Sequence, residues 1–349
     1  MTTGIVYDET FLKHDYPGHP ENRVRLERIV ALLQASRVWE RLRIVPARAV
    51  ERQQLAQVHR PAYIDRVRAI AERGGGHLDP DTYVCADSFE AALVAAGGTL
   101  EAVSAVLDGR VQNAFALVRP PGHHAMPGHG MGFCLFGNVA LAARLACLER
   151  GLERVAIVDF DVHHGNGTQA MTEDDPAICY ISTHQHPLYP GTGMVHEAGR
   201  GRAAGTLVNI PLPPGAGDRS FRAVYEQVVF PIVRRFAPGL LLVSAGFDAH
   251  WSDPLAGLAL SLTGYDWLTR SLVALAGDVC DGRIVFVLEG GYQLDVLSFA
   301  VLNTFRALLG ADTMDDPSGL CPWPREPDVT GLITTLRRLH GLDAQGHNA

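Results

Sequence analysis

Three residues with metal-binding side chains, Asp161, His163 and Asp248, stand where the ligands of one ion could meet. Asp161 and His163 are two positions apart, and in an extended chain the side chains of residues i and i+2 point to the same side. Asp248 follows a different apolar run and could complete the set. Two carboxylates and an imidazole, with a position left for water, form a catalytic zinc arrangement. We therefore expect one zinc ion here, which would acidify bound water and polarise a carbonyl group.

An isolated Asp-x-His pair is more often an ordinary polar feature of a loop than a metal site. In this chain the pair belongs to the string Asp-Phe-Asp-Val-His-His-Gly-Asn at residues 159–166, directly after the apolar run 155–158. So many metal-competent side chains at the end of a buried strand favour the metal site over the ordinary loop.

Two adjacent histidines, His123 and His124, follow the string Arg-Pro-Pro-Gly. They could form a second metal pair, act as acid and base groups, or lie at the surface. Neutral imidazole near pH 7 suits a general base, and each ring needs a partner that fixes its tautomer. Asp159 and Asn166 are the candidate partners, because they flank the expected ligands. An Asp partner raises the pKa of its histidine more than an Asn partner does, so we expect the two histidines to differ.

Tyr292 follows two glycines, Gly290 and Gly291, which allow close backbone approach or a positive φ. A Tyr hydroxyl at such a place could donate to an oxyanion and so stabilise a tetrahedral intermediate. The alternative is a Tyr that packs beside a flexible loop, and spacing alone does not decide between the two.

Four short, continuous apolar runs precede these polar strings, at residues 114–118, 155–158, 240–243 and 284–288. Such runs suit strands that are buried on both faces of a parallel sheet. In open parallel sheets, ligands bind outside the carboxyl ends of the strands. We therefore predict a three-layer α/β fold, in which a central, mainly parallel β-sheet is flanked by helices and carries one convergent site.

Helical patterns alternate with the expected strands. Asp87 and Glu90 have the spacing of a capping box, Thr263 could cap a later helix, and Pro231 should kink the helix that contains it. The helices are expected over about residues 26–33, 87–107, 137–150, 220–236 and 263–281.

Composition narrows the class of protein. A net charge of -8 with a pI near 6.0 does not resemble the basic stripe of a nucleic-acid binder, so no direct nucleic-acid partner is expected. The N-terminus does not read as a signal peptide, and no apolar stretch reaches the roughly 20 residues of a membrane span. Six scattered cysteines without a Cys-x-x-Cys pair predict neither disulfides nor a cysteine zinc site. We expect a cytoplasmic enzyme.

At these residues the sequence resembles the histone deacetylase superfamily, nearest its class II and bacterial histone-deacetylase-like members. The resemblance implies an arginase- and deacetylase-like α/β fold, hydrolysis of N-acetyl amides, and a single catalytic domain over residues 1–349 with a core of about 4–311 and a C-terminal tail of about 312–349. The matching strings, in family order, are Arg-Pro-Pro-Gly-His-His-Ala from 119, Gly-Phe-Cys from 132, Asp-Phe-Asp-Val-His-His-Gly-Asn-Gly-Thr-Gln from 159, Ser-Ala-Gly-Phe-Asp from 244 and Leu-Glu-Gly-Gly-Tyr from 288.

The resemblance also assigns catalytic roles. It implies one zinc ion on the three ligands named above. His124 matches the general base and faces Asn166. His123 matches the other active-site histidine, held by Asp159. Tyr292 matches the tyrosine that polarises the acetyl carbonyl together with zinc.

Further positions match residues around the substrate. Gly132 and Phe133 match one wall of an acyl-lysine tunnel, and Tyr189 matches the aromatic residue opposite. Arg25 stands where the family has an arginine that lines an internal acetate channel. Asp81 matches a rim residue that orients the substrate backbone.

Family members also bind potassium near the zinc, so a structural K⁺ or Na⁺ is expected. The positions that match the first site are Asp159, Asp161, His163, Ser182 and Thr183. A second monovalent-cation site would lie around Thr172, Asp175 and Ile178.

Two positions bear on the substrate. Tyr292 argues for an active enzyme, because branches with His there are poor deacetylases. Leu255 stands where acetylpolyamine-selective members can carry Glu, and it offers a cationic polyamine no charge partner. We therefore expect an acyl-lysine protein or peptide as substrate. An acetylpolyamine or other small acetylated amine, a dimanganese ureohydrolase reaction and a non-catalytic acyl-lysine reader are the alternatives, and a homo-oligomer is left open.

Overall fold

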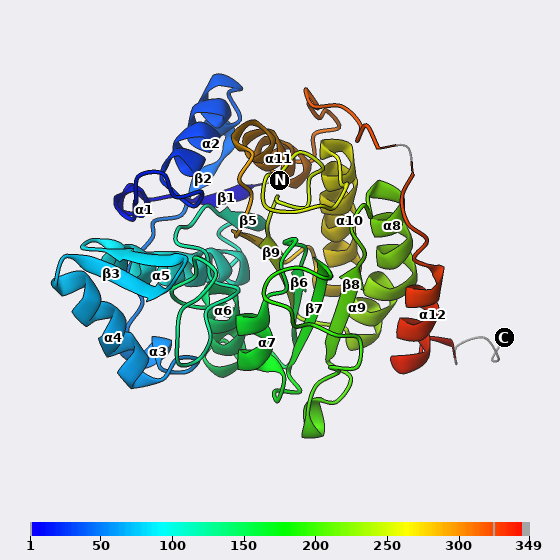
Figure 1. Cartoon of the computed structure of the whole chain (residues 1–349), viewed down its shortest axis with the longest axis horizontal. Helices are drawn as coiled ribbons and strands as arrows, with labels where there is room; N and C mark the ends of the chain where they lie inside the picture. The colour runs from blue at the N-terminus through cyan, green and yellow to red at the C-terminus, as the bar shows by residue number, and fades with distance from the viewer. Residues whose placement is uncertain (1, 324, 344–349) are drawn as a thin grey trace.

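The central sheet of this computed structural model, which describes residues 2–323 and 325–343, has eight strands whose pairings are all parallel. Their order is β2-β1-β5-β10-β9-β6-β7-β8, and a separate antiparallel hairpin pairs β3 with β4. Figure 1 shows the sheet between two sets of helices, which confirms the predicted three-layer α/β architecture. The strands are β1 Thr3–Val6, β2 Arg43–Ile44, β3 Gly75–Asp79, β4 Thr82–Cys85, β5 Asn113–Ala116, β6 Val155–Asp159, β7 Ile178–Gln185, β8 Leu207–Leu212, β9 Leu240–Ala245 and β10 Ile284–Leu288.

The four apolar runs of the sequence form β5, β6, β9 and β10, which are neighbours in the middle of the sheet. Every residue of these four strands is buried, because helices cover both faces. Since the strands are parallel, their carboxyl ends meet at one edge, and the polar strings that follow them are brought together there.

The helices form two groups that pack on different faces of the sheet (Figure 1). In one group α5 and α6 pack together and against β5 and β6, and in the other α10 and α11 pack together and against β9 and β5. The helices are α1 Thr10–Lys13, α2 Val24–Ala35, α3 Arg52–Leu55, α4 Pro61–Glu72, α5 Ser88–Leu107, α6 Asn138–Leu148, α7 Asn166–Thr172, α8 Asp218–Val224, α9 Phe230–Phe236, α10 Leu262–Cys280, α11 Leu294–Leu308 and α12 Thr330–Leu339.

Two predicted helix caps are wrong, although the helices themselves are present. The Asp87 side chain makes no capping hydrogen bond at the start of α5, so the expected capping box is absent. At the start of α10 the hydroxyl of Ser261, not of Thr263, accepts a hydrogen bond from the Gly264 N–H at 3.0 Å. Thr263 instead donates to Asp316.

The helix predicted over residues 220–236 is interrupted by a π-helical turn, Tyr225–Val229, between α8 and α9. Pro231 lies in the first turn of α9, has no N–H to donate and would crowd the carbonyl four residues earlier. That carbonyl belongs to Gln227, and it accepts a hydrogen bond from Arg337 of the C-terminal segment at 3.1 Å. The wider π-helical turn therefore removes the crowding between Pro231 and the Gln227 carbonyl, where a simple kink of the helix was expected.

Two expectations about chain segments also change. The sequence suggested no stretch that could span a membrane, yet α5 is long and apolar enough to do so by length and composition. It is a core helix here, since 72% of its most apolar window is buried inside the protein. The segment after residue 311 was expected to be a C-terminal tail outside the core. It contains α12, whose Ile333 and Leu336 are buried in the main hydrophobic core.

Candidate active site

Asp161, His163 and Asp248 meet at the carboxyl ends of β6 and β9. The Nδ1 atom of His163 lies 3.2 Å from Oδ1 of Asp161 and 3.4 Å from Oδ2 of Asp248. One ligand atom from each residue lies within 4.8 Å of the others. The Oδ2 atom of Asp248 is buried and has no hydrogen-bond partner among the described residues. A buried carboxylate oxygen without a partner is costly, and a cation between these three side chains would remove that cost.

The electrostatics of the three residues call for positive charge. Burial lowers the pKa of His163, but the neighbouring carboxylates of Asp161 and Asp248 outweigh burial and raise that pKa to about 10. Burial would raise the pKa of Asp161, yet His123 and His163 lower it below its usual value. A site that stabilises a proton on an imidazole between two carboxylates stabilises a metal ion in the same place, and one N and two O ligands suit a divalent cation such as zinc.

His123 pairs with the carboxylate of Asp159. Its Nδ1 lies 3.2 Å from Oδ2 of Asp159, which also accepts a hydrogen bond from the Tyr180 hydroxyl at 2.8 Å. Its Nε2 lies 3.7 Å from Oδ1 of Asp161. Burial lowers the pKa of His123, but the two aspartates outweigh it and raise the pKa to about 10.

His124 pairs with an amide instead. Its Nδ1 lies 2.8 Å from Oδ1 of Asn166, whose Nδ2 is directed at the sulfur atoms of Met126 and Met131. The amide oxygen therefore accepts from Nδ1, which leaves Nε2 of His124 without the proton. Burial, followed by the charges of His123 and His163, holds the pKa of His124 well below its usual value. The two adjacent histidines thus differ, one stabilised as a cation and the other as a neutral base.

Tyr292 is held from three sides. Its backbone N–H donates to Oδ2 of Asp253 at 2.7 Å, and the Leu255 N–H donates to the other oxygen of the same carboxylate at 3.0 Å. The ring meets Phe133 edge to face with centroids 5.8 Å apart, and the Arg25 guanidinium lies 5.1 Å from the ring centroid. Burial raises the pKa of the Tyr292 hydroxyl well above its usual value, so it remains a donor at working pH.

A cavity of about 190 Å³ opens over these groups. Larger surface hollows, such as one beside Arg110 and Arg283, contain none of them. Gly132 has a φ of +55°, and a Cβ there would lie 2.4 Å from the His124 ring and 3.0 Å from Tyr189, so only glycine fits this wall. The lining residues are Asp81, His124, Gly132, Phe133, His163, Leu188, Tyr189, Leu255 and Tyr292.

Comparison with known proteins agrees with this site. A model of the histone deacetylase domain matches residues 19–308 of the chain. The chain belongs to the histone deacetylase family. A probable deacetylase from Archaeoglobus fulgidus is 44% identical over 89% of this chain and 88% of its own length. A histone deacetylase-like amidohydrolase from Pseudomonas aeruginosa is 38% identical over 94% of this chain and 87% of its own length.

The crystal structure of the HDA15 HD domain matches the histone deacetylase fold of this chain with a TM-score of 0.88 at 37% identity, and covers 97% of this chain and 94% of that one. The arginase- and deacetylase-like fold expected from the sequence is therefore confirmed. Together with the named relatives, the family match identifies a hydrolytic enzyme of the deacetylase and amidohydrolase type.

Arg25 lies behind the cavity of this histone deacetylase-family protein and does not line it. Its Nε donates to the Gly291 carbonyl at 2.8 Å, and its Nη2 donates to the Glu289 carbonyl at 2.6 Å. The Nη1 atom of Arg25 forms an ion pair with Oε1 of the buried Glu21 at 3.2 Å. Arg25 therefore braces the loop that carries Tyr292.

The residues expected around monovalent cations lie on two neighbouring strand ends. Ser182 pairs with Asp159 across β6 and β7, and the Thr183 hydroxyl donates to the Asp159 carbonyl at 3.2 Å. The second expected group, Thr172, Asp175 and Ile178, forms one turn between α7 and β7. There the Asp175 carboxylate already accepts from Arg144 at 2.8 Å. Binding of K⁺ or Na⁺ at either place stays a prediction.

Sequence reasoning missed three residues of the site: Asp253, Tyr180 and Leu188. Asp253 carries no motif of its own, and its contact with Tyr292 joins segments about 40 residues apart. Tyr180 lies inside a buried strand and looks like a core residue until its hydroxyl is found on Asp159. Leu188 carries no chemical signal, and only its position beside Tyr189 could have suggested a wall of the cavity.

Proposed function

We propose that the protein is a zinc-dependent deacetylase that hydrolyses N-ε-acyl-lysine to lysine and a carboxylate. The observation that supports it most is a narrow cavity with Phe133 and Tyr189 in its walls and His124, His163 and Tyr292 within reach. An acylated amine on a four-carbon stem could pass the aromatic walls and present its carbonyl to these polar groups.

The metal would be held by Asp161, His163 and Asp248, and when bound it would lower the pKa of water and polarise the amide carbonyl. His124, neutral and with Nε2 free to accept, takes a proton from the attacking water. Tyr292 donates to the carbonyl oxygen as negative charge develops there. His124 then returns its proton to the leaving amine.

His123 supports this cycle as a neighbouring cation. Its ring centroid lies 4.0 Å from that of His124, and Asp159 and Asp161 stabilise its charge. Positive charge beside the reacting carbonyl lowers the energy of the oxyanion. Burial, and then the charge of His123, holds the pKa of His124 low, so the ring stays neutral before the substrate arrives.

Acyl-lysine is the proposed substrate because Leu255 gives this part of the cavity an apolar wall. Asp81, also at the cavity, would accept hydrogen bonds from the peptide backbone of the substrate. An acetylpolyamine is the second candidate. It is favoured by a pair of acidic residues here, since the Asp81 N–H donates to the Asp79 carboxylate at 3.2 Å and neighbouring carboxylates attract an extended polycation.

A substrate panel tests this proposal. Hydrolysis rates are measured for peptides with acetyl-, longer acyl- and trifluoroacetyl-lysine and for acetylspermidine, with the bound metal counted by elemental analysis. We expect kcat/KM to be highest for an acyl-lysine peptide, with one zinc ion per chain. A higher kcat/KM on acetylspermidine would identify a polyamine, not acyl-lysine, as the preferred substrate. Two manganese ions per chain would support a ureohydrolase. No turnover with zinc bound would support a non-catalytic acyl-lysine reader.

A further inference from the structure

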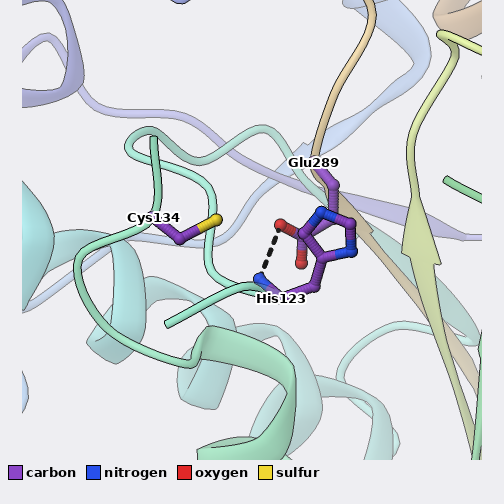
Figure 2. A group of neighbouring side chains, drawn as sticks. All are labelled: His123, Cys134 and Glu289. Carbon is purple, nitrogen blue, oxygen red and sulfur yellow. Dashed lines mark hydrogen bonds between the residues drawn. The ribbon is translucent and has the colours of Figure 1, made fainter. Parts of the chain in front are cut away.

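Glu289 belongs to the Leu-Glu-Gly-Gly-Tyr string but has no part in the proposed cycle. It is fully buried at the end of β10, and with His123 and Cys134 it forms a second group whose ligand atoms lie within 4.8 Å of one another (Figure 2). A buried carboxylate beside the catalytic histidines needs a physical reason, because burial of a charge without partners is costly.

A second metal ion is not that reason. Both ring nitrogens of His123 are directed at other carboxylates, Asp159 at 3.2 Å and Asp161 at 3.7 Å. Burial raises the pKa of the Cys134 thiol well above its usual value, so the thiolate that a metal requires is disfavoured. Figure 2 shows that the bond between His123 and Glu289 starts from the backbone nitrogen of His123, not from its ring.

The hydrogen bonds of Glu289 join two loops. Its Oε2 accepts the backbone N–H of Gly122 at 2.7 Å and that of His123 at 3.2 Å. Its Oε1 is 3.4 Å from the Ser244 hydroxyl, which donates the weaker bond. The side chain that directly follows β10 therefore holds the backbone at the point where the catalytic histidines begin.

Space around this backbone is limited. A Cβ at Gly122 would lie 2.6 Å from both the Asn138 nitrogen and the Phe136 carbonyl oxygen, so the loop is packed tightly against the start of α6. Loss of the acceptor would leave two buried N–H groups unsatisfied, and the loop could regain partners only by moving. A displacement of about 1 Å of a catalytic group can cost on the order of 10² in rate.

We propose that Glu289 is a positioning residue, whose carboxylate holds the Gly122–His123 backbone so that the rings of His123 and His124 face the reacting carbonyl. The inference rests on the proposed function, because it assigns the two histidines to catalysis. The positioning role depends on the length of the Glu289 side chain and on its acceptor oxygen, not on its charge.

Three substitutions separate reach from charge. Glu289→Gln keeps an oxygen for the two N–H groups and turns its NH₂ toward the Ser244 hydroxyl, which can accept. Glu289→Asp keeps the charge but is shorter by one CH₂. Glu289→Leu keeps the approximate volume and removes the acceptor. With an acetyl-lysine peptide we expect kcat within about threefold of wild type for Gln, and losses of about tenfold for Asp and about 10–100-fold for Leu. KM should stay within about twofold and zinc content unchanged, since neither depends on this backbone.

Glu326 provides a matched control away from the cavity. Its carboxylate accepts the backbone N–H groups of Gly217, Arg219 and Ser220 at 2.8 to 3.1 Å. Glu326→Leu should lower the Tm and leave kcat per folded protein unchanged. If Glu289→Leu behaves in the same way, or if Asp retains more activity than Gln, the inference is wrong.

The comparison of Gln with Asp keeps the test decisive even when the Leu variant fails to fold. A wild-type protein that hydrolyses no substrate of the panel would overturn the proposed function itself. An active wild type with equal kcat in all Glu289 variants would overturn only the positioning role.

Discussion

Replacement of Tyr292 by Phe removes one hydroxyl and little else. The contact with Phe133, the position of Arg25 over the ring and the backbone hydrogen bond to Asp253 do not involve the hydroxyl, so the variant should keep the fold of the loop. In the proposed mechanism the missing hydroxyl is the donor to the developing oxyanion. Loss of one such donor costs on the order of 10²–10³ in kcat, or about 3–4 kcal/mol of transition-state stabilisation.

The pH dependence sharpens this prediction. Burial raises the pKa of Tyr292 well above its usual value, so its hydroxyl keeps the proton over the whole range in which the enzyme would be assayed. The Tyr292→Phe variant should therefore lose the same factor in kcat at pH 6.5 and at pH 9, and its pH profile should be the wild-type profile moved down.

The assay is steady-state hydrolysis of an acetyl-lysine peptide, with zinc content and thermal unfolding measured on the same samples. KM should change by less than about threefold, because the hydroxyl acts mainly in the transition state. Turnover of the variant close to wild type, or a loss confined to high pH, would refute the proposed role of the hydroxyl.

Three further predictions concern the metal, the substrate and the stability. Asp248→Asn keeps an acceptor for the Val162 N–H, now at 2.9 Å, but replaces the unpartnered carboxylate oxygen by NH₂. Elemental analysis should therefore show the zinc content falling from near one ion per chain to near zero. Retained zinc would exclude Asp248 as a ligand. Leu255→Glu should raise kcat/KM for acetylspermidine at least tenfold, which is about 1.4 kcal/mol, and lower kcat/KM for an acetyl-lysine peptide. An unchanged ratio of the two kcat/KM values would show that this position does not select the substrate. Burial lowers the pKa of His59 to about 4 in the folded protein from an ordinary 6.5. The unfolded chain therefore binds this proton more readily, and stability present above pH 6.5 should be lost progressively as pH falls through 4, by up to about 3 kcal/mol from this residue. Thermal unfolding of His59→Gln between pH 7 and 4.5 should show a shallower slope of Tm with pH, and an unchanged slope would contradict this.

The elements that carry the site were predictable because their signal is local. A continuous apolar run such as residues 284–288 suits few structures other than a buried strand, and parallel strands bring their polar endings to one edge. Asp161, His163 and Asp248 could thus be grouped from the sequence, and the structure brings them together. The roles of these residues in catalysis stay predictions.

The details that escaped prediction depend on contacts between distant segments. Whether Asp87 or Ser261 caps its helix is decided by backbone angles at the first turn, which neighbouring residues in space determine. The carbonyl of Gln227, in the π-helical turn before Pro231, is bound by Arg337, more than 100 residues later. The contacts of Asp253 and Glu289 are likewise invisible in the sequence, because they form only when β9 and β10 lie side by side.

The missing side chain at Gly132 limits how the family's pocket can diversify in this chain. Any other side chain at position 132 would collide with His124 and would have to adopt an unfavourable φ. This wall of the cavity therefore cannot change by substitution at position 132. Leu188 and Leu255, by contrast, line the cavity with flexible side chains that can be exchanged for larger, smaller or charged ones. New acyl preferences should therefore arise by substitutions on that side of the cavity, and a saturation library scored for activity should be nearly empty at position 132 and well populated at 188 and 255.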